Sequence, residues 1–248
     1  PHTWPTTNQA AVQDALENCE DRNQLELYGD FANQYDLKAK YKIFVDSKNW
    51  AEYPAKIISV DIDKDGNIDH VQSQTLIEVK SDIKTLTGGP MRIGNKGLKI
   101  STSALERALS TTDTPWPGDC DLLLFENNNP IAIIELKKNT MNPTSQWHRP
   151  IREESLNNYY SRTEWKADNR KYNRLAILKD EIKENLPIII LYYPVWESSN
   201  VSDNVIKLEK VVGAYGNLLI EDSLILGVPI SSNDKADFIH NLIDFIEA

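Results

Sequence analysis

The sequence lacks several features that would each indicate a particular class of protein. Its 248 residues contain no apolar run of about 18 residues, the length that a helix needs to cross a bilayer. No basic segment followed by an apolar stretch is present, so no secretory signal is expected. The two cysteines, Cys19 and Cys120, are too few for a disulfide scaffold and favour a reduced, cytoplasmic protein.

Motifs for metal clusters and nucleotides are also missing. There is no Cys-x-x-Cys pair and no Cys/His cluster, which argues against a structural zinc site. The glycine-rich segment GPMRIGNK lacks the Gly-Lys-Ser/Thr ending of a phosphate-binding loop. A nucleotide-driven motor is therefore not expected in this chain.

The charge is negative overall but unevenly distributed. The formal net charge is −10, which argues against indiscriminate binding of nucleic acid. Between Glu135 and Lys179, however, ten Lys and Arg face five Asp and Glu, so this stretch carries +5 and the remainder −15. A basic stretch in an acidic chain indicates a local surface for an anionic partner.

The order of the expected elements predicts an α/β fold, with a mixed central sheet flanked by helices. Apolar periodicity predicts helices over residues 8–22, 101–110, 150–162, 168–185 and 234–247. Strands are expected in a hairpin over 55–80, in the runs 122–125 and 131–134, and over 187–194 and 205–230. We expect residues 1–88 to form an N-terminal extension or subdomain, and residues 89–248 to form the core.

Charged residues lie at the ends of the two central apolar runs. Asp121 precedes the first run, and Glu135 and Lys137 close the second. If the runs pair antiparallel through the ENNNP turn, Asp121 lies beside Glu135. Lys137 follows by two residues and therefore points to the same face of its strand as Glu135. The sequence thus predicts Asp, Glu and Lys together at one edge of a sheet.

Two neighbouring carboxylates repel each other unless a cation lies between them. A divalent ion such as Mg²⁺ prefers one or two carboxylates together with water and phosphate oxygens. A protonated lysine cannot bind the metal, but it can hold a water molecule or a phosphate oxygen in place. This set of groups is typical of a site that activates water for attack on a phosphodiester.

The segment CDLLLFENNNPIAIIELKK resembles the PD-(D/E)xK nuclease superfamily, and within it the nuclease segment of type I restriction motor subunits. The resemblance implies a restriction-endonuclease-like core and Mg²⁺-dependent (or Mn²⁺-dependent) cleavage of DNA. It implies that Asp121, Glu135 and the carbonyl of Leu136 bind the metal, and that Lys137 positions the attacking water. It also implies DNA as the partner, in a homodimer or a larger restriction or defence assembly, without a membrane.

Two acids of this motif have open assignments. Family members often add an acid from the preceding helix, and Glu106 is the matching catalytic candidate. The Pro-Asp pair of the family is broken here, because Pro117 is followed by Gly118 and Asp119. Asp119 therefore competes with Asp121 for the role of the first acid.

The basic stretch after the motif supplies candidates for contacts with nucleic acid. Cations meet phosphates and aromatic rings stack on bases. Aromatic residues on helices are otherwise core residues, and a basic face is otherwise simply solvated. The candidates are Lys138, Arg149, Arg152, Tyr160, Arg162, Lys166 and Arg170.

Three other interpretations compete with this one. Asp69 and Glu78-Val79-Lys80 repeat the motif, although the alternating pattern of that segment favours a surface hairpin. Residues 61–69, DIDKDGNID, resemble a calcium loop, but position twelve is Gln72 where a bidentate Glu is expected. Finally, the same fold can serve as a non-catalytic module that binds nucleic acid or a protein.

Overall fold

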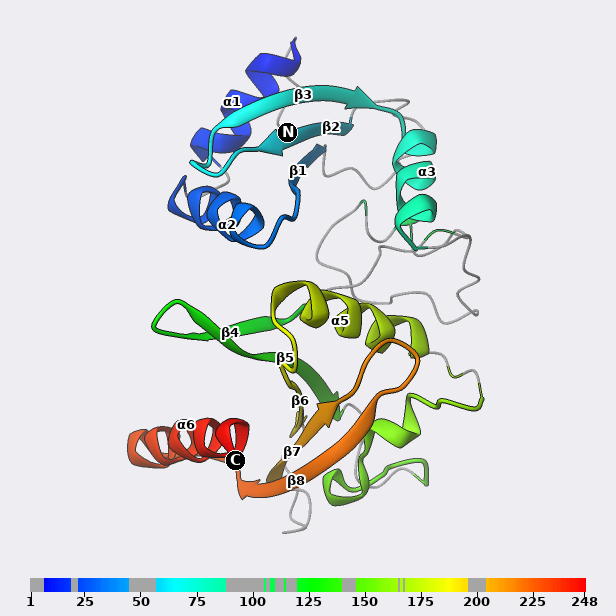
Figure 1. Cartoon of the computed structure of the whole chain (residues 1–248), viewed down its shortest axis with the longest axis vertical. Helices are drawn as coiled ribbons and strands as arrows, with labels where there is room; N and C mark the ends of the chain where they lie inside the picture. The colour runs from blue at the N-terminus through cyan, green and yellow to red at the C-terminus, as the bar shows by residue number, and fades with distance from the viewer. Residues whose placement is uncertain are drawn as a thin grey trace. The chain divides into compact units, whose positions relative to one another are not determined.

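The computed structural model describes residues 7–18, 22–44, 57–87, 105, 108–109, 114, 120–139, 146–164, 166, 168–195 and 204–248. The chain divides into two compact units, Pro1–Pro117 and Gly118–Ala248 (Figure 1). Each unit has helices and its own sheet, which confirms the α/β class. The division falls at residue 117, whereas the sequence suggested residue 88.

The first unit contains a three-stranded antiparallel sheet. Its strands, in spatial order, are β1 (Ala39–Phe44), β2 (Ile57–Ile62) and β3 (Ile68–Gln74). Two helices come before β1 in the chain: α1 (Asn8–Asn18) and α2 (Arg22–Gln34). Ala11, Val12 and Ala15 of α1 pack against Ile58 and Val60. The expected helix at 8–22 is thus present but shorter, and α2 follows it directly.

The end of the predicted hairpin is wrong, because residues from Leu76 onward form a helix, α3 (Leu76–Thr87). The Thr75 amide donates to the Glu78 carboxylate at 2.6 Å, and the Glu78 amide donates to the Thr75 hydroxyl at 3.1 Å. This reciprocal pair is a capping box, which satisfies amides that the first turn of a helix leaves without partners. Val79 and Ile83 then pack against Ile57.

The second unit contains a five-stranded sheet in the order β4-β5-β6-β7-β8. Its strands are β4 (Leu122–Glu126), β5 (Asn129–Asn139), β6 (Ile188–Pro194), β7 (Val205–Val212) and β8 (Leu219–Gly227). Strands β5 and β6 are parallel and the other neighbours are antiparallel. The parallel pair needs a crossover, and helix α5 (Asn169–Ile182) lies in it.

Helices cover the two faces of this sheet (Figure 1). On one face, Phe245 and Ile246 of α6 (Ser232–Glu247) pack against Ala132, Ile134 and Leu208 of the sheet. The other face carries α5 and two short 3₁₀ helices, η2 (Ile151–Glu153) and η3 (Leu156–Asn158). The expected strands at 187–194 and 205–230 and the helices at 168–185 and 234–247 are therefore confirmed, with small shifts at their ends.

The expected helix at 150–162 is wrong. The chain is extended at Glu154 and Ser155, so that only the two 3₁₀ turns form. In a continuous helix, the Leu156 amide would donate to a backbone carbonyl of the same helix. Here it donates instead to the buried carboxylate of Glu209 on β7 at 2.7 Å. A tertiary hydrogen bond thus replaces the local one here. Within the part of the chain that is described, no helix is both long and apolar enough to span a membrane.

Candidate active site

The β4–β5 hairpin brings Asp121 next to Glu135, as the sequence predicts. Asn127 and Asn128 form its turn with φ angles of 48° and 63°, which asparagine tolerates better than most residues. Leu122 pairs with Ile134 and Leu123 with Ile133, so the same register places Asp121 opposite Glu135. The Asp121 Oδ2 atom accepts a hydrogen bond from the Leu136 amide at 2.7 Å.

The Glu135 carboxylate is buried, and the residue is only 1% exposed. Its Oε1 atom lies 2.6 Å from the Nζ atom of Lys171, whereas its Oε2 atom has no hydrogen-bond partner among the described residues. The pKa of Glu135 is raised to about 7, chiefly by burial; Lys171 opposes this rise, and the nearby Asp121 carboxyl adds to it. One positive charge is therefore not enough to stabilise this pair of acids.

Lys137 points to the same face of β5 and is held by two groups from the following segment. Its Nζ atom donates to Asp168 Oδ2 at 2.6 Å and lies 3.8 Å from the centre of the Tyr159 ring. Asp168 is the N-cap residue of α5, yet its side chain makes no capping hydrogen bond. Because an N-cap contributes about 1 kcal/mol to helix stability, Asp168 gives up local stability in order to orient Lys137.

Sequence reasoning missed Asp168, Lys171 and Tyr159. A signal was present for the first two, since Asp168 and Lys171 are three residues apart at a helix start and so share one face. Nothing in the sequence indicates that this face meets Glu135 and Lys137. The stacking of Lys137 on Tyr159 depends on the two 3₁₀ turns, which the sequence did not predict.

A second layer of buried polar groups supports the site from β6 and β7. The register aligns Lys137 with Tyr192 and Tyr192 with Lys207 across three strands. The Glu209 carboxylate accepts from the Tyr192 hydroxyl at 3.1 Å and pairs with Lys207 at 2.9 Å. Burial raises the pKa of Tyr192, and Glu209 adds to the effect, so Tyr192 remains a neutral donor. These satisfied groups fix the shape of the site.

The residues present fit a hard divalent metal. In the described ranges, no group of three or more His, Cys, Asp and Glu is close enough to hold an ion. Mg²⁺ does not need such a group, because it binds through one or two carboxylates and keeps several waters. Asp121 and Glu135 supply two carboxylates, one of them with a buried oxygen that lacks a partner. In an antiparallel pair, the amide and carbonyl of one residue point to the same neighbour, so the Leu136 carbonyl faces the side of Asp121.

The predicted nucleic-acid contacts have different environments. Tyr160 is 2% exposed, and its ring packs edge-on against Tyr172, so the structure places it in the core instead of on the predicted surface. Arg149 is half-exposed and lies 3.5 Å from the Glu154 carboxylate. The remaining candidates are exposed or partly exposed: Lys138, Arg152, Arg162, Lys166 and Arg170.

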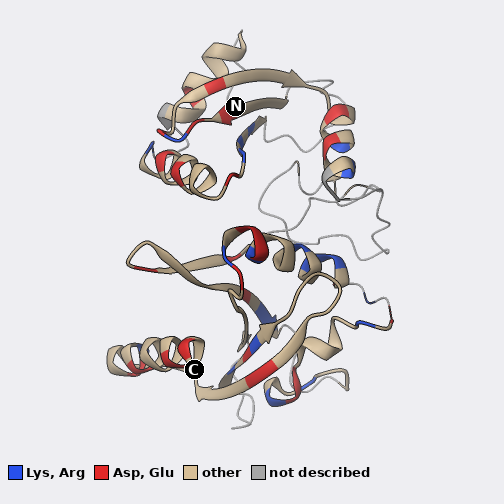
Figure 2. Cartoon of the chain, in the orientation of Figure 1, with Lys and Arg blue, Asp and Glu red and all other residues tan. Residues whose placement is uncertain are grey.

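The charges of α5 run against its own dipole. Arg170, Lys171 and Arg174 lie in its N-terminal half, and the acidic residues Asp180 and Glu181 lie in its last turn beside Lys179 (Figure 2). A helix is stabilised by the opposite arrangement, at about 0.3–1 kcal/mol per charge. Burial, together with the neighbouring Arg170, lowers the pKa of Arg174. The helix that brings Lys171 to Glu135 thus has three cations in its N-terminal half, at a cost in local stability.

The competing motifs have other roles in the structure. Glu78 caps α3 and Asp69 is exposed on β3, so these residues do not form a second strand-end site. Asp63 accepts hydrogen bonds from the amides of Asp65 and Asn67 at 2.9 and 2.8 Å, which is a self-contained turn. Glu106 and Asp119 lie outside the described residues.

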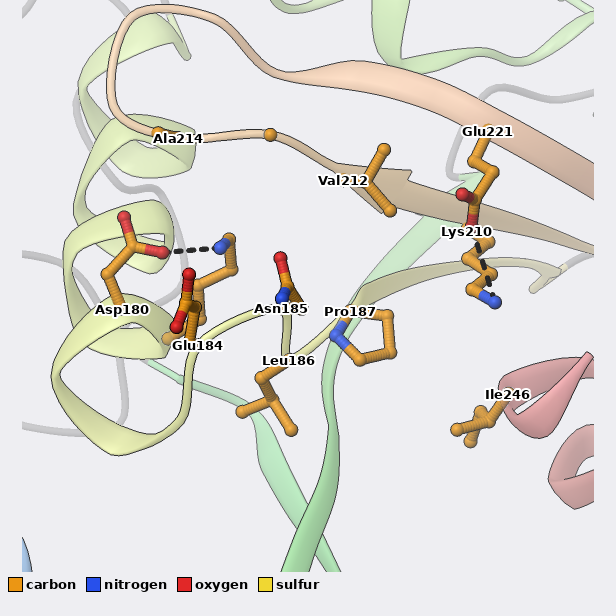
Figure 3. Close-up of a pocket in the computed structure, with 12 residues that line it drawn as sticks. Asp180, Glu184, Asn185, Leu186, Pro187, Lys210, Val212, Ala214, Glu221 and Ile246 are labelled. Carbon is orange, nitrogen blue, oxygen red and sulfur yellow. Dashed lines mark hydrogen bonds and ion pairs between the residues drawn. The ribbon is translucent and has the colours of Figure 1, made fainter.

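A cavity of about 840 Å³ lies in the same unit but away from Glu135 and Lys137. Figure 3 shows charged side chains that line it, with dashed lines for two ion pairs. These pairs are Lys179 with Asp180 and Lys210 with Glu221. The lining therefore neutralises its own cations.

Comparisons with known proteins add no assignment. No protein-family model, no curated protein and no solved structure matches the chain.

Proposed function

We propose that the chain is a metal-dependent endonuclease that hydrolyses DNA phosphodiesters, built on a restriction-endonuclease-like core. The observation that supports it most is that Asp121 lies opposite Glu135 of β5. The Glu135 carboxylate is buried, and one of its two oxygens has no hydrogen-bond partner among the described residues. Two carboxylates in contact, one of them with a pKa near 7, form a site that gains from a divalent cation.

Each residue has a role that follows from its position. Asp121, Glu135 and the Leu136 carbonyl would hold Mg²⁺ or Mn²⁺, which when bound would supply Lewis-acid activation of water and neutralise charge on the phosphate. Lys137 is oriented by Asp168 and the Tyr159 ring, and its role would be to position the attacking water. Its ammonium also stabilises the negative charge that develops in the transition state.

The basic half of α5 supports a polyanionic substrate. Arg170, Lys171 and Arg174 lie within the first six residues of the helix that contacts Glu135. Phosphate groups meet arginine and lysine side chains at such positions. We therefore propose DNA as the partner, and a cytoplasmic restriction or defence role, as a homodimer or within a larger assembly.

Cleavage of plasmid DNA with Mg²⁺ tests the proposal, and the chain offers a matched control. The double variant Glu135→Ala with Lys137→Ala should lose at least about a hundredfold in rate, because it removes metal binding and transition-state stabilisation together. The double variant Glu78→Ala with Lys80→Ala removes the same residue types from the repeated motif and should cleave normally. Equal cleavage by both double variants would refute the assignment.

A non-catalytic binding module is the second candidate. The ion pair between Glu135 and Lys171 favours it, because a buried salt bridge can be purely structural. Calorimetric titration with Mg²⁺ or Mn²⁺ separates the two candidates. A nuclease takes up the metal and loses this uptake in Asp121→Asn, whereas a module shows no uptake in either protein.

A further inference from the structure

Two ion pairs join the start of α5 to the end of β5 in a crossed arrangement. Lys171 of the helix meets Glu135 of the strand at 2.6 Å, and Asp168 of the helix meets Lys137 of the strand at 2.6 Å. The helical residues are three apart and the strand residues two apart, so each pair presents one face. Glu135 and Lys137 are thereby each paired with an opposite charge from the segment at the start of α5, whereas Asp121 accepts a hydrogen bond from a backbone amide.

Helix stability does not explain Lys171. The residue lies in the first turn of α5, where the helix dipole disfavours a cation. The acid that could offset it as a cap, Asp168, is turned toward Lys137. What Lys171 contacts instead is the Glu135 carboxylate, which is otherwise a buried anion beside a second anion, Asp121.

The two partners differ in their freedom to move. The side chain of Glu135 is 2% exposed, whereas that of Lys171 is 29% exposed. A lysine has a flexible four-carbon stem and a strongly hydrated ammonium, so Lys171 can turn into water while Glu135 cannot. With Lys171 turned away, the carboxyl groups of Asp121 and Glu135 are left for one divalent cation to bind.

We propose that Lys171 is the resident counter-ion of Glu135 in the metal-free protein, and that a divalent cation displaces it on binding. This inference rests on the proposed metal site, but it does not require that the protein cleave nucleic acid. It adds Lys171 to the residues of the site and makes metal binding an exchange of one cation for another.

Chemical labelling of lysines in the full-length wild-type protein tests the exchange. Acylation rates at single lysines are measured by mass spectrometry, with and without Mg²⁺. An ion pair protects an ammonium by about 1 kcal/mol, so Lys171 should react about fivefold faster with Mg²⁺ present. Lys183 lies at the C-terminal end of the same helix and donates to the Pro130 carbonyl, so its rate should not change.

The variant Glu135→Gln provides the second control. Without the carboxylate, Lys171 should react at the fast rate whether or not Mg²⁺ is added. A Lys171 rate that Mg²⁺ leaves unchanged in the wild type overturns the inference, whether or not calorimetry detects metal uptake. If Lys171 responds to Mg²⁺ but no nucleic acid is cleaved, the exchange stands and the nuclease proposal fails. If DNA is cleaved but the Lys171 rate does not respond to Mg²⁺, the nuclease proposal stands and the exchange is refuted.

Discussion

The raised pKa of Glu135 predicts how the stability of the second unit depends on pH in the absence of metal. The ordinary pKa of a glutamate is 4.5, and burial beside Asp121 raises that of Glu135 to about 7. The folded state therefore binds a proton more tightly than the unfolded state between these two values. Stability from this group is complete below pH 4.5 and is lost as the pH rises through 7.

The size of the effect follows from the same values. Each pH unit between the two pKa values corresponds to about 1.4 kcal/mol, so ionising Glu135 in the folded protein costs roughly 3 kcal/mol. In the variant Glu135→Gln, the side chain no longer ionises, so this contribution to the pH dependence of stability is removed. The free energy of unfolding of the wild type, measured relative to this variant, should fall by about that amount between pH 4.5 and 7.5.

The assay must report on the second unit alone, because the two units need not unfold together. Hydrogen-exchange mass spectrometry in urea, on peptides from β5 to β7 with EDTA present, meets this need. Glu78→Gln, in the first unit, is the control: hydrogen bonds from Thr75 lower the pKa of Glu78, and removing this carboxyl should leave the stability of the second unit unchanged across the same pH range. A difference between wild type and Glu135→Gln that does not change with pH would refute the reasoning.

Three further predictions concern stability. Thr75→Ala removes one half of the capping box and should destabilise the first unit by about 1 kcal/mol, measured by urea unfolding, whereas Thr75→Ser should not. Gly66→Ala should cost at least about 2 kcal/mol in the same assay, because φ is +73° and the new Cβ atom would lie 2.7 Å from the Glu26 amide nitrogen; an unchanged midpoint would contradict the turn geometry. Tyr172→Phe should stabilise the second unit by about 1 kcal/mol, because the buried Tyr172 hydroxyl has no hydrogen-bond partner in the described structure; a loss of stability would show that this hydroxyl has a partner.

The central strands and their charged ends could be predicted from the sequence. Continuous apolar runs and an Asn-rich turn predict a hairpin that brings Asp121 near Glu135. Their direct opposition also depends on an irregularity between Leu124 and Phe125, which shifts the pairing by one residue. Lys137 follows from the two-residue period of a strand. These relations are local in sequence, which is why pattern reasoning captures them.

The partners of these residues could not be predicted in the same way. Lys171 and Asp168 reach β5 only because α5 packs across the sheet, and this depends on the parallel β5–β6 crossover. The helix expected after Pro150 fails because the Leu156 amide finds a carboxylate 53 residues away on β7. The start of α3 has a local signal, the capping box of Thr75 and Glu78, which the hairpin prediction over 55–80 overlooked.

The most direct test of the account is the location of a divalent ion. Crystals grown with Mn²⁺ and measured at its absorption edge reveal the ion by its anomalous signal. The account predicts a peak bound by carboxylate oxygens of Asp121 and Glu135 and by the Leu136 carbonyl, with the Lys171 ammonium moved off Glu135. An absent peak, with Lys171 still 2.6 Å from Glu135, would contradict it.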